Sequence, residues 1–421
     1  MHRTLLLASA IALVAGPALG KPAAAPEAVA AAALKAAPVW DGHNDVPEQL
    51  RIRRKNLLGD FDFTDTTGTA NPAKGVIVMQ TDLKRLRAGH VGALFWSVYV
   101  SATLPEPQAV QATLEQIDVM KRLIARYPQD LSYCETAACT EQALKAGKIA
   151  SLLGMEGGHS IGGSLAVLRQ MHSLGARYMT LTHFKNSAWA DSATDTPEHD
   201  GLTPFGASVV REMQRLGMLV DLSHVSEASM NDALDVAGAP VIFSHSGAQG
   251  VNGHPRNVSD AVLKRLPGNG GIVMVNTYPP YVAETIRSWN ALRAAEEARL
   301  KSIHIGFPAA AKAAQEAWEK ANPRSRATVA DLADHVDHVV KIAGIDHVGI
   351  GGDFDGMDIV VDGMEDVSGY PALFTELARR GWSQAALEKL ASRNMMRVLK
   401  AAEAHAREHS MDPPVENAVS F

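Results

Sequence analysis

The sequence has little cysteine, no long basic block and, beyond its N-terminus, no long apolar run. Its 421 residues include only two cysteines, Cys134 and Cys139, and carry a formal net charge of −6 at pH 7. This mild charge and the lack of a basic block argue against nucleic acid as a partner. No internal stretch reaches the roughly 18 uninterrupted apolar residues of a membrane span. The hydrophobic content of 46% is ample for one large barrel or two ordinary domains.

Residues 1–20 have the pattern of a secretory signal peptide, with a basic start, a short apolar run and small residues at the expected cleavage region. Residues 21–37, rich in Ala and Pro, predict a mobile linker because they offer little to pack. No lipidation cysteine follows the apolar run, so we expect a soluble, periplasmic or secreted protein with no stable membrane anchor. In an oxidising compartment, Cys134 and Cys139 could form one small-loop disulfide or remain two unpaired thiols.

Eight short apolar segments recur from residue 38 onward, and each is followed by sequence with helical character. In order they are PVWDGHND, ALFWSVYV, IASLLGMEG, RYMTLTHF, LVDLSHVS, PVIFSHSG, GIVMVNTY and HVGIGGDFDG. Their continuous apolar character suits parallel strands that are buried on both faces. Eight strand–helix alternations within residues 38–405 predict an α/β fold, the (β/α)8 TIM barrel, with an open doubly wound sheet as the structural rival.

Two segments lie outside this alternation. Residues 281–326, between the seventh strand and the last crossover helix, are rich in Ala, Glu, Lys and Arg and have apolar residues at helical spacing. They predict a helical insertion of one or two helices, which is either a packing decoration or a lid over the mouth of the barrel. Residues 406–421 predict a short, polar C-terminal tail.

Polar residues at the ends of the predicted strands favour the barrel over the open sheet. These strand-end residues are His43, Asp45, Glu156, His183, His224, His245 and Asp353. In a barrel the C-terminal ends of the strands converge on one mouth, where active sites lie. His43 and Asp45 are two residues apart and would project from the same face of a strand, although the turn formers around them also fit a simple turn.

Five of these residues form a set that suits divalent metals. His224 and His245 each end a strand in the dipeptide Ser-His, and Glu156 precedes two glycines that allow close approach. Together with His43 and Asp45 they make three imidazoles and two carboxylates. That set is too large for one tetrahedral zinc ion, but it suits two divalent ions bridged by a carboxylate and a hydroxide.

Seven motifs occur in order between Trp40 and Arg397, apart from the insertion: DGHNDVP, GMEGGHSI, LTHFKNSAWADS, VDLSHVS, VIFSHSGA, HPRNVSD and GGDFDG. As a set they resemble the membrane (renal) dipeptidase family of zinc metallopeptidases, which have amidohydrolase-type barrels. The resemblance implies a secreted dipeptidase with two Zn²⁺ ions per chain, in which a metal-bridging hydroxide attacks the peptide bond of a dipeptide. It also implies broad dipeptide specificity and, in many members, homodimers.

The resemblance further implies how the metals are held. Carried over by position, His43 and Asp45 bind one zinc ion, and His224 and His245 bind the other. Glu156 bridges the two ions.

Three more residues receive roles from the same resemblance. It implies that His183 faces the substrate carbonyl, that Arg256 binds the substrate carboxylate, and that Asp353 faces the scissile nitrogen. These roles make chemical sense, because an oxyanion needs a donor, a carboxylate suits the planar fork of Arg, and a departing amine needs a proton. Asp355, in the same segment as Asp353, is the rival acid.

The sequence alone also permits a different bridging ligand and a different reaction. Lys185 could serve as a carboxylated bridging lysine, although Glu156 already meets that need. The same site would serve a lactonase, deaminase or phosphotriesterase of the wider superfamily, or a zinc- or peptide-binding protein without turnover. His335 and His338 precede the last strand, at the far end of the barrel, and there they predict structural hydrogen bonding.

Overall fold

Eight parallel strands close into a barrel in the computed structural model, which describes residues 24–71, 73 and 75–417. They are β1 (Val39–Asn44), β2 (Val91–Tyr99), β4 (Ile149–Glu156), β5 (Ala176–Thr180), β6 (Leu219–Asp221), β7 (Ile242–Phe243), β8 (Ile272–Asn276) and β9 (Val348–Gly351). The strand order is β2-β1-β9-β8-β7-β6-β5-β4, and a pairing of β2 with β4 closes the ring. The predicted barrel is therefore confirmed and the open sheet is wrong. The predicted signal peptide, residues 1–20, lies outside the described residues.

Successive strand residues supply two different cores, which explains why the strands are apolar on both faces. Trp40, Phe95 and Leu152 belong to the cluster that fills the barrel interior. Their chain neighbours Val39 and Leu153 belong to the larger cluster between the strands and the surrounding helices. Because side chains alternate along a strand, each strand needs apolar residues at nearly every position. A short strand that the sequence analysis missed, β3 (Leu131–Tyr133), adds to β4 outside the ring.

Helices surround the barrel and connect its strands. They are α2 (Val46–Arg54), α3 (Leu83–Ala88), α4 (Glu106–Arg126), α5 (Ala137–Lys145), α6 (Leu165–Ser173), α7 (Pro204–Leu216), α8 (Glu227–Val236), α9 (Asp260–Leu263), α10 (Leu266–Asn269), α14 (Val329–Ala343), α15 (Tyr370–Arg379), α16 (Gln384–Glu388) and α17 (Asn394–Glu408). Within the described part of the chain, no helix combines the length and apolar character needed to cross a lipid bilayer.

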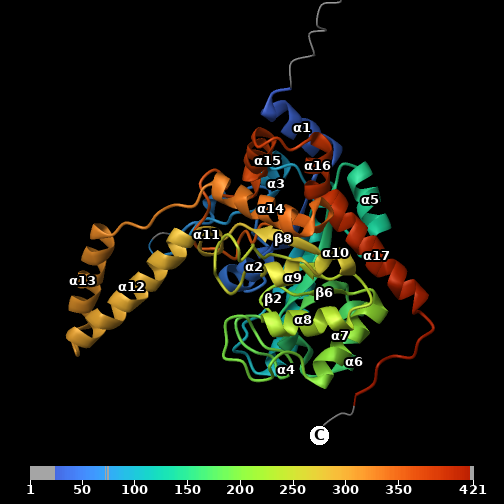
Figure 1. Cartoon of the computed structure of the whole chain (residues 1–421), viewed down its shortest axis with the longest axis horizontal. Coiled ribbons are helices and arrows are strands. Elements are labelled where there is room, and N and C mark those ends of the chain that lie inside the picture. The colour runs from blue at the N-terminus through green and yellow to red at the C-terminus, as the bar shows by residue number, and fades with distance from the viewer. Residues whose placement is uncertain (1–23, 72, 74, 418–421) are drawn as a thin grey trace, which may run out of the picture.

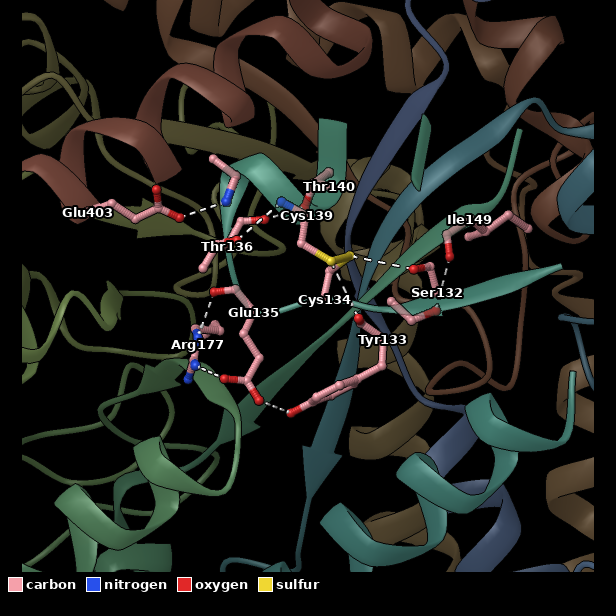
Figure 2. The surroundings of a disulfide bond; sticks show 12 residues. Ser132, Tyr133, Cys134, Glu135, Thr136, Cys139, Thr140, Ile149, Arg177 and Glu403 are labelled. Atoms are coloured by element: carbon pink, nitrogen blue, oxygen red, sulfur yellow. Dashed lines mark hydrogen bonds and ion pairs between the residues drawn. A yellow bond between two sulfur atoms is a disulfide. The ribbon is translucent and has the colours of Figure 1, made fainter. Parts of the chain in front are cut away.

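The two cysteines are joined in a disulfide, Cys134–Cys139, which links the end of β3 to the first turn of α5 (Figure 2). The side chain of Thr136 caps α5 by accepting a hydrogen bond from the backbone N–H of Cys139 at 3.2 Å. Glu135, between them, accepts the phenol hydrogen of Tyr133 at 2.7 Å. Of the two thiol states that the sequence left open, the structure has the disulfide.

The predicted linker is wrong for its described residues. Residues 26–36 form helix α1 (Pro26–Ala36), which packs against α15 and α16 (Figure 1). Alanine has the highest helix propensity, and its small side chain lets two helices approach closely. Ala30, Ala33 and Leu34 are buried on one face, so the alanine-rich sequence does offer a surface to pack.

The predicted insertion contains two long helices that form a hairpin beside the barrel. After α11 (Pro279–Val282), helices α12 (Glu284–Ile303) and α13 (Pro308–Ala321) run side by side and extend away from the barrel (Figure 1). They are held together by the rings of Trp289 and Trp318, whose centres are 6.0 Å apart, and by an ion pair of 2.6 Å between Arg293 and Glu319. Several apolar side chains of this hairpin are exposed, namely Leu292, Ile303, Ile305 and Phe307.

Candidate active site

The residues that the sequence places at strand ends come together at one mouth of the barrel. His43 lies in β1 and Glu156 is the last residue of β4, while the others follow their strands by one to three residues. Three overlapping groups of donor atoms, each within 4.8 Å of one another, are His43 with Glu156 and His245, Glu156 with His183 and His224, and His43 with Asp45 and Asp353. All seven strand-end residues are therefore in one cluster.

Glu156 lies at the centre of this cluster. Its Oε1 is 3.1 Å from Nε2 of His224, 3.3 Å from Nε2 of His245 and 3.5 Å from Nε2 of His183. Its Oε2 faces the other side, 3.4 Å from Nε2 of His43. The two oxygens of one carboxylate thus face imidazoles from opposite walls of the barrel. His183, at 3.5 Å, is only 0.1 Å farther from Glu156 than His43 is, so distance alone does not separate its role from that of the predicted ligands.

The backbone around the cluster adopts conformations that are uncommon for residues other than glycine. His224 has a φ of 66° and Asp353 a φ of 60°, both in the left-handed region. Such strain of roughly 1–3 kcal/mol per residue is typical of functional sites. At Gly356 a Cβ atom would lie 2.4 Å from Oδ2 of Asp45, so only glycine lets this loop approach the carboxylates.

The donor atoms fit divalent metal ions better than they fit one another. Nε2 of His43 is buried and lacks a hydrogen bond of normal geometry within the described residues, although Oδ2 of Asp45 lies 3.4 Å away. Nε2 of His224 and Nε2 of His245 face each other at 2.9 Å. Two nitrogens at that distance share either a proton or a cation. Imidazole nitrogens and carboxylate oxygens together are the donor set that zinc prefers.

Side chains behind the imidazoles leave their Nε2 atoms available. Nδ1 of His43 is 2.9 Å from the phenol oxygen of Tyr178, and Nδ1 of His245 is 2.9 Å from Oγ of Ser244. The hydroxyl of Ser244 donates its one proton to Asp221 at 2.6 Å, so it accepts the Nδ1–H of His245. Asp221 ends β6 and also accepts two backbone N–H groups of the loops beside it. Partners of this kind fix the tautomer of a metal-binding histidine.

Burial and neighbouring charges set the protonation states of the cluster. Burial lowers the pKa of His224 and of His245 well below the ordinary value, and it lowers the pKa of His183 to about 4. Burial opposes the charge of Glu156, yet the imidazoles around it hold its pKa well below the ordinary value. Burial also opposes the charge of His43, but a phenol and two carboxylates raise its pKa well above the ordinary value. A metal ion bound at His43 would therefore displace a proton.

Asp353 and Asp355 have different environments although they share one loop. Oδ2 of Asp353 accepts a hydrogen bond from Nδ2 of Asn276 at 2.9 Å. Burial, and then the charge of Asp45, raises the pKa of Asp353 to about 8. Asp355 instead makes two hydrogen bonds with Gln80. Its carboxylate accepts the backbone N–H of Gln80 at 2.8 Å, and its own backbone N–H donates to Oε1 of Gln80 at 2.7 Å. Of the two acids, Asp353 lines the site cavity.

Arg256 is a fully buried cation without a carboxylate partner among the described residues. Its guanidinium donates to the backbone oxygen of His245 at 3.1 Å and to Oγ of Ser246 at 3.3 Å, and its Nε has no partner there. The guanidinium carbon is 5.3 Å from the ring centre of Tyr281, which lines the cavity. An unpaired buried charge is costly, so the guanidinium has the chemistry to bind an anionic group.

The cluster opens into a cavity of about 320 Å³. Its carboxylates are Asp45, Glu48, Glu156, Asp353 and Asp358, and its aromatic side chains are Tyr99, Phe184, Tyr278 and Tyr281. Glu48 belongs to the first turn of α2, and burial followed by the charge of Asp45 raises its pKa to about 8. A neighbouring cavity of about 540 Å³, lined in part by Trp289 of α12, shares Tyr278 and Asp358 with the site. The base of the hairpin therefore borders the site, and its action as a lid stays a prediction.

Three residues considered from the sequence lie apart from the ligand atoms. Lys185 pairs with Asp195 at 3.2 Å and its side chain is 56% exposed, so it does not reach Glu156 as a bridging lysine would. His335 holds backbone groups of the loops that follow β7 and β8, both at 2.9 Å. His338 is 2.7 Å from Oδ1 of Asp260. The prediction of structural hydrogen bonding is confirmed, but His335 is near the mouth and not at the far end, because α14 starts on the mouth side.

The residues that support and extend the site are not evident from the sequence motifs. These are Glu48, Tyr178, Asp221, Ser244, Asn276 and Tyr281. Asp221 and Asn276 are the last residues of β6 and β8, so the rule that selected the strand-end ligands could also have selected them. Tyr178 carries no such signal, because within a strand it resembles any other core aromatic residue.

A closed parallel barrel with buried imidazoles and carboxylates at its mouth has the architecture of the barrel metallohydrolases. This chain belongs to the membrane dipeptidase family, peptidase family M19, whose model matches residues 27–412. It is therefore a hydrolase of the metallopeptidase class.

Solved structures share this fold. The probable dipeptidase PvdM from Pseudomonas aeruginosa superposes with a TM-score of 0.76 at 22% identity, covering 90% of this chain and 99% of that one. A metallo peptidase from Rhodobacter sphaeroides, liganded with a phosphinate mimic of the dipeptide L-Ala-D-Ala, gives 0.69 at 24% identity, over 87% and 99% of the two chains. The dipeptidase AC, of family M19, gives 0.69 at 26% identity, over 87% and 98%.

Proposed function

We propose that this chain is a binuclear zinc dipeptidase. The observation that carries the proposal is the placement of Glu156, whose two oxygens face imidazole nitrogens on opposite sides at 3.1 to 3.5 Å. One carboxylate placed in this way can bridge two metal ions. Membership of the membrane dipeptidase family and the dipeptide mimic bound to one relative support a dipeptide as the substrate.

Each ion has its own ligands in this proposal. His43 and Asp45 would hold one zinc ion, His224 and His245 the other, and Glu156 would lie between them. Two bound zinc ions would lower the pKa of a water that they share, so that hydroxide is available near neutral pH to attack the peptide carbonyl.

Asp353 would move the proton. It lines the cavity beside Asp45, and Asn276 holds one of its oxygens at 2.9 Å, which leaves the other free to face the reacting atoms. As carboxylate it would take the proton of the attacking water, and as acid it would give that proton to the departing amine nitrogen. The same group thus serves both halves of the reaction.

His183 would stabilise the substrate carbonyl oxygen. Burial keeps its imidazole neutral at neutral pH, because its pKa is lowered to about 4. A neutral imidazole still has one N–H to donate to the oxyanion that forms during attack. It adds no positive charge that would repel the metal ions.

Arg256 would bind the C-terminal carboxylate of the dipeptide. Because the buried guanidinium has no carboxylate partner within the described residues, we expect the enzyme to require the C-terminal carboxylate of its substrate.

Against a panel of dipeptides, their C-terminal amides and simple lactones, the zinc-loaded protein should cleave the dipeptides. The amides should react at least about 100-fold more slowly, the usual cost of removing one partner of a buried charge pair. Product analysis gives the rates. Equal rates on acids and amides would remove Arg256 from this role, and turnover of lactones alone would replace the dipeptidase assignment.

The same proposal includes export of the chain. Residues 1–20 have the pattern of a signal peptide, and a disulfide between Cys134 and Cys139 fits an oxidising compartment. N-terminal sequencing of protein recovered from the periplasm or the medium tests for cleavage. An intact N-terminus in the cytoplasmic fraction would contradict export.

A further inference from the structure

The cavity contains a carboxylate that the proposed chemistry does not use. Glu48 lines the cavity from the first turn of α2, three residues after Asp45, and is half-buried. Neither a hydrogen bond nor an ion pair reaches its side chain from the described residues, although most buried acids of this protein have such partners. An acid held in a small, acidic cavity without a donor is unfavourable unless a ligand supplies one.

The charges of the cavity indicate what kind of ligand group would do so. Five carboxylates line it, and among the described residues none of the lining side chains is Lys or Arg. Bound cations favour the ionised form of nearby carboxylates, so with two divalent ions in place the five carboxylates would carry one more negative charge than the four positive charges of the ions, before any hydroxide is counted. A cationic group on the substrate is therefore favoured.

A dipeptide carries such a group close to the reacting bond. The N-terminal nitrogen is two bonds from the scissile carbonyl carbon, a distance of about 2.5 Å. When the carbonyl lies at the metals, the ammonium group must therefore lie within a few ångströms of them. The anionic groups that line the same cavity are its five carboxylates.

Elimination among these carboxylates leaves Glu48. Asp45 and Glu156 are proposed metal ligands, and Asp353 is the proposed proton carrier. Asp358 is exposed and already accepts the phenol hydrogen of Tyr278 at 3.1 Å. Glu48 is the partly buried acid to which no metal, proton transfer or hydrogen bond is assigned.

We infer that Glu48 binds the free α-ammonium group of the N-terminal residue and so restricts the enzyme to substrates with an unblocked amino terminus. This inference rests on the proposed dipeptidase function. It adds a residue that binds the amino end of the dipeptide. Arg256 would bind the carboxylate of the dipeptide and Glu48 would bind its ammonium group. The distance between these two residues would exclude longer peptides.

The test asks whether the preference for a substrate with a free amino group depends on Glu48. L-Ala-L-Ala and its des-amino analogue, propanoyl-L-Ala, are hydrolysed by wild type, Glu48→Gln, Glu48→Asp and Asp358→Asn, and zinc content is measured for each protein. Wild type should prefer the amine-bearing substrate in kcat/KM. Glu48→Gln should reduce that preference by about 10- to 100-fold, the worth of a hydrogen bond to a charged group. Glu48→Asp, which keeps the charge, should retain more of the preference than Glu48→Gln, and Asp358→Asn should retain all of it.

The outcomes separate this inference from the proposed function. A zinc-loaded wild type that hydrolyses neither substrate would overturn the dipeptidase proposal and the role of Glu48 with it. If wild type cleaves L-Ala-L-Ala and Glu48→Gln keeps the full preference, the role of Glu48 alone is overturned. Zinc loss in Glu48→Gln would likewise overturn it, because the residue would then support the metals.

Discussion

Asp353→Asn is expected to lower kcat on dipeptides by about two to four orders of magnitude while the protein keeps its zinc, the usual worth of a positioned acid–base group. Asn has nearly the same shape and still accepts a hydrogen bond from Asn276, but it cannot take or give the proton. The variant should also bind dipeptide normally, because the change removes a step of the reaction and not a contact with the ground state. Steady-state kinetics together with metal analysis measure both effects.

Asp355→Asn is the matched control, since it makes the same change two residues away. Asp355 holds the backbone of Gln80 and does not carry the proposed proton. Its substitution should lower the free energy of unfolding by about 1–3 kcal/mol, the cost of disturbing a buried hydrogen bond, and should leave most of kcat. Near-normal turnover of Asp353→Asn, or greater damage in Asp355→Asn, would show that Asp353 is not the working acid.

Glu156→Gln is expected to lose most of the bound zinc and with it nearly all activity. The substitution keeps the size of the side chain but removes the charge that lies between His43 on one side and the other three imidazoles on the other. Without that charge, two dications would be brought together with no anion of the protein between them, and their repulsion in a buried site is large. Zinc content after reconstitution, measured for wild type and variant side by side, gives the result.

His183→Ala is the comparison that this prediction needs, because His183 is nearly as close to Glu156 as His43 is. If His183 contacts the carbonyl and not a metal, its variant should keep its zinc and lose about 10²- to 10³-fold in kcat, as loss of one oxyanion donor does. Equal zinc loss in both variants would make His183 a ligand and would leave the oxyanion without its proposed donor.

The sequence was sufficient for the barrel and for the position of its site. Strands buried on both faces, such as IASLLGMEG, leave a clear apolar signal, and a polar residue such as Glu156 at the end of one has no place in either core. Because the C-terminal ends of parallel strands meet at one mouth, these residues could be placed together before any contact was known.

The parts that could not be predicted depend on contacts between distant segments. The alanine-rich stretch that includes Ala30 and Ala33 has the composition of a linker, and alanine alone does not show which helix it will pack against. The stacking of Tyr281 on Arg256, and the absence of a partner for Glu48 in the described structure, follow from how loops of different strands fold over the mouth. No spacing within one segment contains that information.

A zinc titration of the metal-free protein, followed by dipeptide hydrolysis at each step, tests the paired metal site. Activity should rise with bound zinc and reach its plateau at about two ions per chain, because the five proposed ligands would form a paired site around Glu156. A plateau at one ion per chain, or full dipeptidase activity in the absence of bound metal, would contradict it.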